Sequence, residues 1–233
     1  MMPAMMLAAG LGTRMRPLTD HVPKPLVKVG GRALIDWSLD QLAATNVDRA
    51  IVNVHYLAPL LVTHLAARKK PAITISDETN ALLDTGGGVV KALPLLGNDA
   101  FFVFNCDAII ADGASPMLGR MLAAWDSAAL DVLMLVHPIE TAHGFDGAGD
   151  FFVEADSAMK RRGNMPRAPF VYAGVYIMHP RVLAGESAVP FSLNKIWDKA
   201  IAAGRMRALV HDGAWYHVGT PEAVSATERL LAP

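Results

Sequence analysis

The chain has 233 residues, of which 52% are hydrophobic and 18% charged, and its formal net charge is −1. These values are typical of one globular domain; they exclude a disordered chain and indicate neither a nucleic-acid nor a membrane-surface partner. One cysteine, Cys106, excludes an intramolecular disulfide, and no apolar run reaches the ~18 residues of a membrane-spanning helix, so we expect a cytoplasmic protein.

The N-terminal stretch MMPAMMLAAG is apolar but short and lacks basic residues, which predicts a strand rather than a signal peptide. Apolar runs and helical patterns alternate from there to about residue 140. The predicted strands are Ala4–Ala9, Ala50–Val54, Ala72–Ser76, Phe101–Asn105 and Val132–His137. The predicted helices are Leu34–Ala44, Pro59–Ala67, Val89–Leu96 and Met117–Trp125. This alternation predicts an α/β fold of Rossmann-like type, with a mixed, mostly parallel sheet flanked by helices.

The pattern changes after about residue 140, where a glycine-rich stretch (His143–Asp150) precedes shorter runs. The predicted strands are Phe151–Val153, Phe170–Met178, Arg207–His211 and Trp215–Val218, and the predicted helices are Leu193–Ala203 and Pro221–Leu231. We expect antiparallel strands here, within a single domain of residues 1–233 that has a first half (1–140) and a smaller second half (141–233).

The first strand runs into a glycine-rich turn, Gly10–Thr13, which is followed by three cations, Arg14, Arg16 and Lys24. Such a turn exposes backbone N–H groups that can hold phosphates, and the cations suit the charge of a triphosphate. The dinucleotide fingerprint fails because Met15 stands where its third glycine should be, and the P-loop motif is absent.

Three later segments carry further candidates. Three glycines, Gly86–Gly88, precede a predicted helix and would place backbone N–H groups at its N-terminus. Asp107 lies just past an apolar strand, where open α/β sheets bind ligands. Thr220 and Pro221 predict the N-cap and first residue of the last helix.

The run G-x-G-T-R-x-x-P-L-T followed by K-P-L resembles the signature of the sugar nucleotidylyltransferase family. The resemblance implies that Arg14 holds the phosphates of a nucleoside triphosphate and that Lys24 bridges the phosphates of both substrates. Arg16 has either a similar role or an exposed ion pair. The implied nucleotide-binding residues are Leu7, Ala9, Gly10, Gly12, Thr13, Asp84, Gly86, Gly87 and Asn105.

The resemblance also implies a Mg²⁺ site, with Mn²⁺ as an alternative. Asn105-Cys106-Asp107 is similar to the family's N-G-D, whose aspartate binds the metal, although Cys106 replaces the glycine. Trp215–Thr220 is similar to W-x-D-V-G-T, but His217 stands in place of the second metal-binding aspartate. Imidazole suits Mn²⁺ or Zn²⁺ better than Mg²⁺. His217 is therefore a direct ligand, a ligand through water, or a packed residue without a metal.

The second half would bind the sugar, through Gly149, Asp150 and Gly174. Asp150 is equally compatible with a charge at a strand edge. Over its whole length the chain is similar to the short family members that transfer uridylyl to N-acetylmuramate 1-phosphate. The basic run Lys160–Arg162 is either a solvated face or a contact for an acidic sugar substituent.

The implied activity joins a nucleoside monophosphate, UMP from UTP, to a sugar 1-phosphate and releases pyrophosphate by in-line displacement. The implied partners are these two substrates, and neither nucleic acid nor a membrane is expected as a partner. We expect a monomer or a small homo-oligomer. Guanylyl transfer to mannose 1-phosphate, another nucleotidyl transfer, and a non-catalytic module that senses nucleotide sugars are the alternatives.

Overall fold

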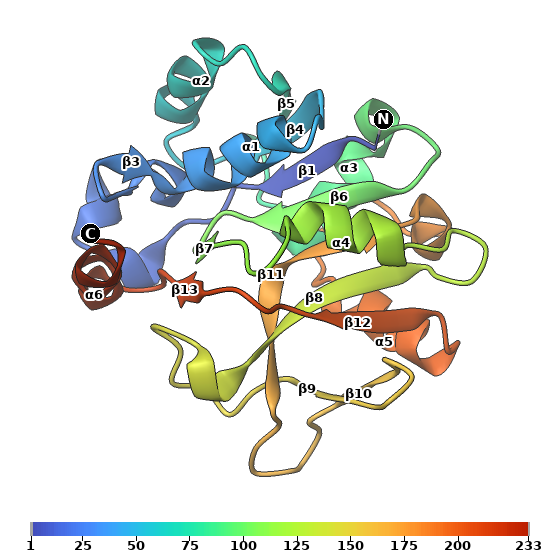
Figure 1. The fold of residues 1–233 in the computed structure, drawn as a ribbon. Coiled ribbons are helices and arrows are strands. Elements are labelled where there is room, and N and C mark those ends of the chain that lie inside the picture. The colour runs from blue at the N-terminus through green and yellow to red at the C-terminus, as the bar shows by residue number, and fades with distance from the viewer. Residues whose placement is uncertain (1, 233) are drawn as a thin grey trace.

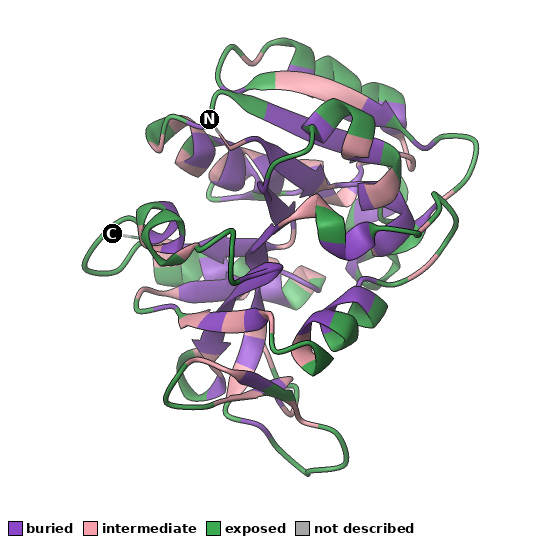
Figure 2. Ribbon diagram, turned by 90° about the vertical axis from the view of Figure 1, so that its right-hand side faces the viewer, coloured by how far each residue is buried: buried purple, intermediate pink, exposed green. Residues whose placement is uncertain are grey.

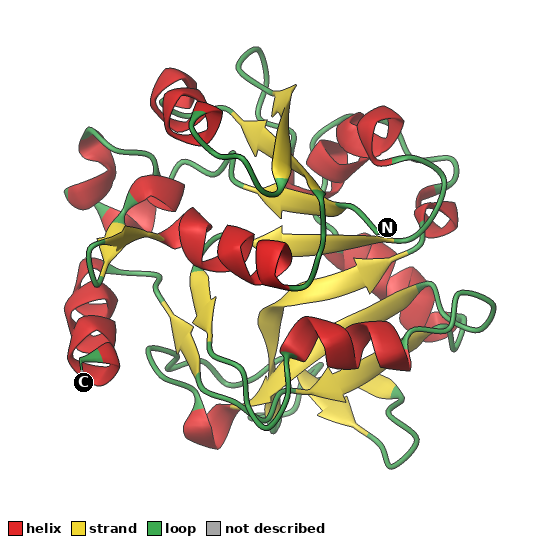
Figure 3. Cartoon of the chain, turned by 45° about the horizontal axis from the view of Figure 1, so that its top comes forward, coloured by secondary structure: helices red, strands yellow, loops and turns green. Residues whose placement is uncertain are grey.

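The computed structural model describes residues 2–232, whose largest sheet has nine strands with helices on both faces (Figures 1 and 3). Its strands are β1 (Ala4–Leu7), β4 (Arg49–Val54), β5 (Ala72–Asp77), β6 (Phe101–Asn105), β8 (Val132–Pro138), β9 (Phe151–Val153), β10 (Met159–Arg161), β11 (Phe170–Met178) and β12 (Met206–Val210). Two small antiparallel sheets pair β2 (Lys28–Val29) with β3 (Arg32–Ala33) and β7 (Ala108–Ile110) with β13 (Trp215–His217).

The parallel part of the sheet has the order β5-β4-β1-β6. β1, β4 and β6 are largely apolar and buried between the two helical layers, whereas most residues of the edge strand β5 are partly or fully exposed (Figure 2). The register aligns Leu7 of β1 with Asn105 of β6, so the carboxyl ends of both strands meet at one edge. The glycine-rich turn and Asp107 follow these two ends and are thereby brought together.

The antiparallel strands expected in the second half are present. β11 lies between β6 and β8 and is antiparallel to both, whereas β12 runs parallel to β8. The boundary near residue 140 therefore divides the chain in sequence, but strands from its two sides alternate in the sheet.

Six α-helices lie within residues 2–232: α1 (Leu34–Ala44), α2 (Ala58–Ala66), α3 (Asp84–Leu96), α4 (Met117–Ala124), α5 (Asn194–Ala202) and α6 (Pro221–Leu231). Buried side chains of α1, α2 and α4 share one core cluster, and those of α3 and α5 share the cluster on the other face. α6 packs with β2, β7 and β13 around a third, smaller cluster. In this part of the chain, no helix combines the length and apolar character needed to cross a bilayer.

The predicted elements are confirmed with small shifts at their ends, and α1, β6, β11 and α6 have the expected bounds. The N-cap prediction is also confirmed, because Thr220 Oγ1 accepts a hydrogen bond of 3.3 Å from Ala223 N. One helix start was predicted wrongly: α3 begins at Asp84 rather than Val89, so its three glycines lie inside the helix.

Candidate active site

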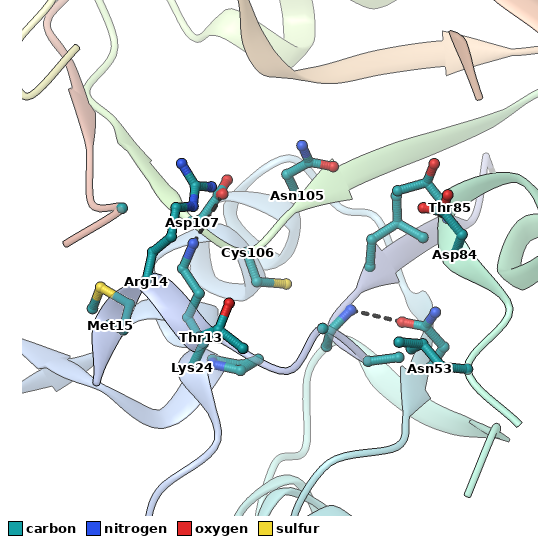
Figure 4. Close-up of a pocket in the computed structure, with 18 of the residues that line it drawn as sticks. Thr13, Arg14, Met15, Lys24, Asn53, Asp84, Thr85, Asn105, Cys106 and Asp107 are labelled. Carbon is teal, nitrogen blue, oxygen red and sulfur yellow. Dashed lines mark hydrogen bonds and ion pairs between the residues drawn. The ribbon is translucent and has the colours of Figure 1, made fainter. Parts of the chain in front are cut away.

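A pocket of about 610 Å³ opens at the carboxyl ends of β1 and β6 (Figure 4). Ten of the predicted site residues line it, namely Leu7, Ala9, Gly10, Gly12, Thr13, Arg14, Lys24, Asp84, Asn105 and Asp107. Figure 4 shows Arg14, Lys24 and Asp107 together at one end, and Asp84 and Thr85 at the other. The pocket therefore has a charged end and a separate end between the first turn and α3.

The glycine-rich turn is shaped by a close approach at Gly12. Its φ is +63°, and a Cβ there would lie only 3.0 Å from Thr19 Cγ2 and 3.1 Å from Lys24 Cβ. The buried Thr19 donates its hydroxyl hydrogen bond to the Gly12 carbonyl at 2.8 Å. Glycine thus allows the turn to pack beside Lys24. Arg16, in contrast, pairs with Asp20 at 3.3 Å on the exposed surface, outside the pocket lining.

Lys24 and Asp107 form the central ion pair of the charged end, with 3.0 Å between Lys24 Nζ and Asp107 Oδ2. Burial raises the pKa of Asp107, but Lys24, His217 and Arg14 together lower that pKa below its ordinary value. The carboxylate therefore stays ionised and can accept a cation. Burial raises the pKa of the neighbouring Cys106 thiol, which excludes Cys106 as a nucleophile.

His217 lies beside Asp107 because β13 pairs antiparallel with β7. His217 faces Ala108 in the register, and the next residue, Val218, donates its N–H to the Asp107 carbonyl at 2.8 Å. The ring also approaches the pocket-lining Gly219, where a Cβ would come 2.5 Å from Nε2. Burial lowers the pKa of His217, so its imidazole is neutral at neutral pH, the form that binds metals.

These donors fit a divalent cation that is shared with a substrate. Among residues 2–232 no group of three His, Cys, Asp or Glu side chains could hold a metal. Asp107 and His217 can supply at most part of a coordination sphere. Mg²⁺ in nucleotide enzymes is bound in this manner, through one or two carboxylates together with substrate phosphates.

Gly86 and Gly87 do not line the pocket, because another segment of the chain packs on them. A Cβ at Gly86 would overlap the Phe191 ring, and one at Gly87 would overlap the Val189 carbonyl. Gly86 N also donates to the Phe191 carbonyl at 2.8 Å. Their contact with the nucleotide stays a prediction, and their observed neighbours are residues 189–191, which we call the strap.

The strap brings Pro190 into the pocket lining, where sequence reasoning did not expect it. Asn53 and Thr85 also line the pocket and were not predicted. Pro190 belongs to no sequence motif that would have indicated a role in the site. Asn53 had one signal, since it is a polar residue within the otherwise apolar strand β4.

The three predicted sugar-binding residues, Gly149, Asp150 and Gly174, lie in or near β11, and none of them lines the pocket. Gly149 has φ of +77°, and a Cβ there would overlap the Ala168 carbonyl. Asp150 Oδ2 accepts from Tyr172 N at 3.0 Å. A Cβ at Gly174 would meet Asn105 Cβ at 3.7 Å, so Gly174 is closest to the pocket. Their role in sugar binding stays a prediction.

The basic run separates into three environments. Lys160 pairs with Glu154, and Arg161 Nε pairs with Asp198 at 2.7 Å. Arg162 Nε donates to the Gly149 carbonyl at 2.9 Å. Two of the three cations are therefore neutralised by surface carboxylates, and Arg162 alone is bound to a predicted sugar-site residue.

Known proteins resemble this chain over nearly its whole length. The family model for nucleotidyl transferases matches residues 3–232. An N-acetylmuramate alpha-1-phosphate uridylyltransferase of Caulobacter vibrioides is 45% identical, covering 98% of this chain and 96% of the relative. A protein of the same name from Neisseria meningitidis serogroup B is 31% identical, covering 94% of each chain.

A solved structure supports the fold. UDP-glucose pyrophosphorylase from Acinetobacter baumanii superposes with a TM-score of 0.79 at 18% identity, over 97% of this chain and 91% of that one. At this identity the likeness extends to the mixed sheet and its flanking helices.

Proposed function

The chain belongs to the nucleotidyl transferase family, and from this premise we propose that it transfers UMP from UTP to N-acetylmuramate 1-phosphate and releases pyrophosphate. The observation that carries the proposal is the meeting of Arg14, Lys24 and Asp107 at one end of a pocket. The similarity to two N-acetylmuramate alpha-1-phosphate uridylyltransferases supports the choice of base and sugar.

In the proposed reaction, a phosphate oxygen of the sugar 1-phosphate forms a bond to the α-phosphorus of UTP. The bond from that phosphorus to the bridging oxygen breaks, and its electron pair leaves with pyrophosphate. Arg14 and Lys24 neutralise the phosphate oxygens and hold both substrates in line. The raised pKa of the buried Cys106 thiol agrees with a direct transfer that needs no covalent enzyme intermediate.

Asp107 and the neutral His217 would hold the divalent cation, Mg²⁺ or Mn²⁺, that this family typically uses. When bound, such a cation neutralises charge on the α-phosphate and the leaving group. Lys24 would then exchange its partner, from the Asp107 carboxylate to substrate phosphate. The buried free thiol of Cys106 is compatible with a reducing compartment, and we place the reaction in the cytoplasm.

The test is pyrophosphate release with each of the four NTPs, crossed with the 1-phosphates of N-acetylmuramate, N-acetylglucosamine, glucose and mannose, in Mg²⁺ and in Mn²⁺. We expect sugar-dependent release with UTP and N-acetylmuramate 1-phosphate. Release with GTP and mannose 1-phosphate instead would overturn the assigned substrates. Absence of release with every pair, despite NTP binding, would contradict the proposed activity.

A further inference from the structure

Glu78 is a carboxylate that the reaction above does not use. It follows β5 directly and is only 1% exposed. Within residues 2–232, no Lys, Arg or His side chain forms an ion pair with it. Burying a carboxylate is costly unless hydrogen bonds compensate for the lost water, so the contacts of Glu78 indicate why it is there.

Its two oxygens accept hydrogen bonds from two different segments. Oε1 accepts from Asn53 Nδ2 at 2.7 Å, and Oε2 accepts from the backbone N–H of Leu83 at 3.3 Å. Asn53, which is 2% exposed, in turn accepts from the backbone N–H of Ala8 at 2.6 Å, the bond drawn dashed in Figure 4. A continuous chain of hydrogen bonds therefore joins Ala8 to Leu83.

These two ends belong to two walls of the pocket that come from different segments of the chain. Ala8 lies in the segment Leu7–Gly10, and Leu83 lies between the pocket-lining residues Leu82 and Asp84. Figure 4 shows that Asn53 and Asp84 lie at the end of the pocket away from Arg14 and Lys24. If the triphosphate occupies the charged end, the nucleoside of UTP extends toward the other end.

The side chains of Glu78 and Asn53 are closely packed against α3. A Cβ at Gly88 would come within 2.8 Å of Glu78 Oε1 and 2.9 Å of Asn53 Nδ2, so only glycine leaves room there. Glu78 N also donates to the Val54 carbonyl at 2.8 Å. The glycine run of α3 thus accommodates Glu78 on one side and the strap on the other.

We propose that Glu78 and Asn53 are positioning residues that fix the two walls around the nucleoside of the bound NTP. The inference rests on the proposed function, because it concerns the same pocket. A carboxylate is required at position 78 since two donors, Asn53 Nδ2 and Leu83 N, must both be accepted. Glutamine has one acceptor oxygen and would face the second donor with its own NH₂ group.

The hydrogen-bond pattern allows a rescue experiment. Glu78→Gln leaves one donor unsatisfied, and Asn53→Asp places a second carboxylate against Glu78. In the double variant, the carboxylate at 53 accepts from Ala8 N and from the amide at 78, whose oxygen accepts from Leu83 N. Every donor is then matched again. Glu154→Gln, at the exposed partner of Lys160, is the matched control.

The readouts are the Kd of UTP without sugar, the KM of each substrate, and the melting temperature. We expect each single variant to raise the Kd and KM for UTP about tenfold, the effect of one unsatisfied buried hydrogen bond. The KM for the sugar 1-phosphate stays unchanged, and the double variant recovers UTP binding. Lower melting temperatures with unchanged UTP affinity, or a double variant no better than the single ones, would overturn the proposal. Because Kd is measured without sugar, failure of the transfer reaction would be seen separately.

Discussion

Asp107 is placed to exchange partners during the reaction. Its carboxylate is paired with Lys24 at 3.0 Å, and the proposed reaction requires Lys24 on phosphate and a cation on Asp107. Lys24 is the main cause of the lowered pKa of Asp107, so a cation that replaces Lys24 would have to compensate the carboxylate in its place. One short ion pair can therefore keep two partly buried charges compensated until both substrates bind.

Removal of the charged groups should reduce turnover strongly. We expect Arg14→Ala and Asp107→Asn each to lower kcat on the order of 10²–10³-fold, the scale for one preorganised charge-stabilising group. Steady-state kinetics with saturating UTP measures this effect. Arg16→Ala is the control, because Arg16 is paired with Asp20 on the surface and should retain near-normal turnover. Losses under about tenfold for both Arg14 and Asp107 would contradict their assigned roles.

Replacing the imidazole of His217 by a carboxylate should change the preferred metal. We expect His217→Asp to raise the ratio of activity in Mg²⁺ to activity in Mn²⁺, because Mg²⁺ prefers oxygen ligands. The measurement is a titration of activity with each metal at fixed UTP. An unchanged ratio would show that His217 has no contact with the cation.

For single residues of the candidate site, those that belong to sequence motifs could be predicted, and those outside any motif could not. Arg14 and Asp107 come after β1 and β6, whose carboxyl ends meet at one edge of the sheet, and the role of Lys24 was implied by the family resemblance. Pro190 lines the same pocket, but it comes from a loop whose packing depends on the whole fold. Asn53 acts through a hydrogen-bond chain, and no local pattern encodes such a partner.

Among the elements, α3 depends most on contacts made by a distant segment. Its first turn is crossed by the strap, with the Phe191 ring at Gly86 and the Val189 carbonyl at Gly87. Glycine has poor helix propensity, and this explains why the sequence pattern suggested a start at Val89. Tertiary packing, rather than propensity, extends the helix to Asp84.

The same substitution should have opposite effects in two helices. Gly87→Ala places a methyl group against the Val189 carbonyl, and we expect it to destabilise the fold by about 1–3 kcal/mol. Gly119→Ala, in exposed α4 with nothing within 4 Å of the new Cβ, should stabilise by about 0.5–1 kcal/mol. Chemical denaturation measures both. Equal effects at the two sites would contradict the packing of the strap on α3.

Long elements could be predicted because their apolar periodicity extends over several turns or a whole strand. The strands that were missed, β2, β3, β7 and β10, have only two or three residues each and carry no readable pattern. β7 is short, but it determines where His217 lies, because its pairing with β13 places His217 beside Asp107.

The stability of the whole molecule should depend on pH through two buried histidines. His137 ends the apolar part of β8, and His211 follows the neighbouring β12; each is 2% exposed, and their ring centroids are 5.6 Å apart. Burial lowers the pKa of both below about 6.5, the value of an exposed histidine. The unfolded chain therefore takes up more protons than the folded one as the pH falls below about 6.5, and stability declines.

We expect the melting temperature to fall as the pH is lowered from neutral through the folded-state pKa values of these histidines. The variant with both His137→Gln and His211→Gln should show a flatter dependence in the same buffers. The exposed His21→Gln serves as the control and should retain the slope of the unmodified protein. Identical slopes for all three proteins would exclude the buried pair as the cause.

The position of β11 has a consequence for synthesis on the ribosome. The first strands emerge early, yet the middle of their sheet is empty until β11 has left the exit tunnel, because β11 separates β6 from β8. The lining of the pocket is completed later still, because it includes Gly219. In the proposed function, nucleotide can therefore occupy the complete pocket, and stabilise the chain there, only after most of its residues have been translated.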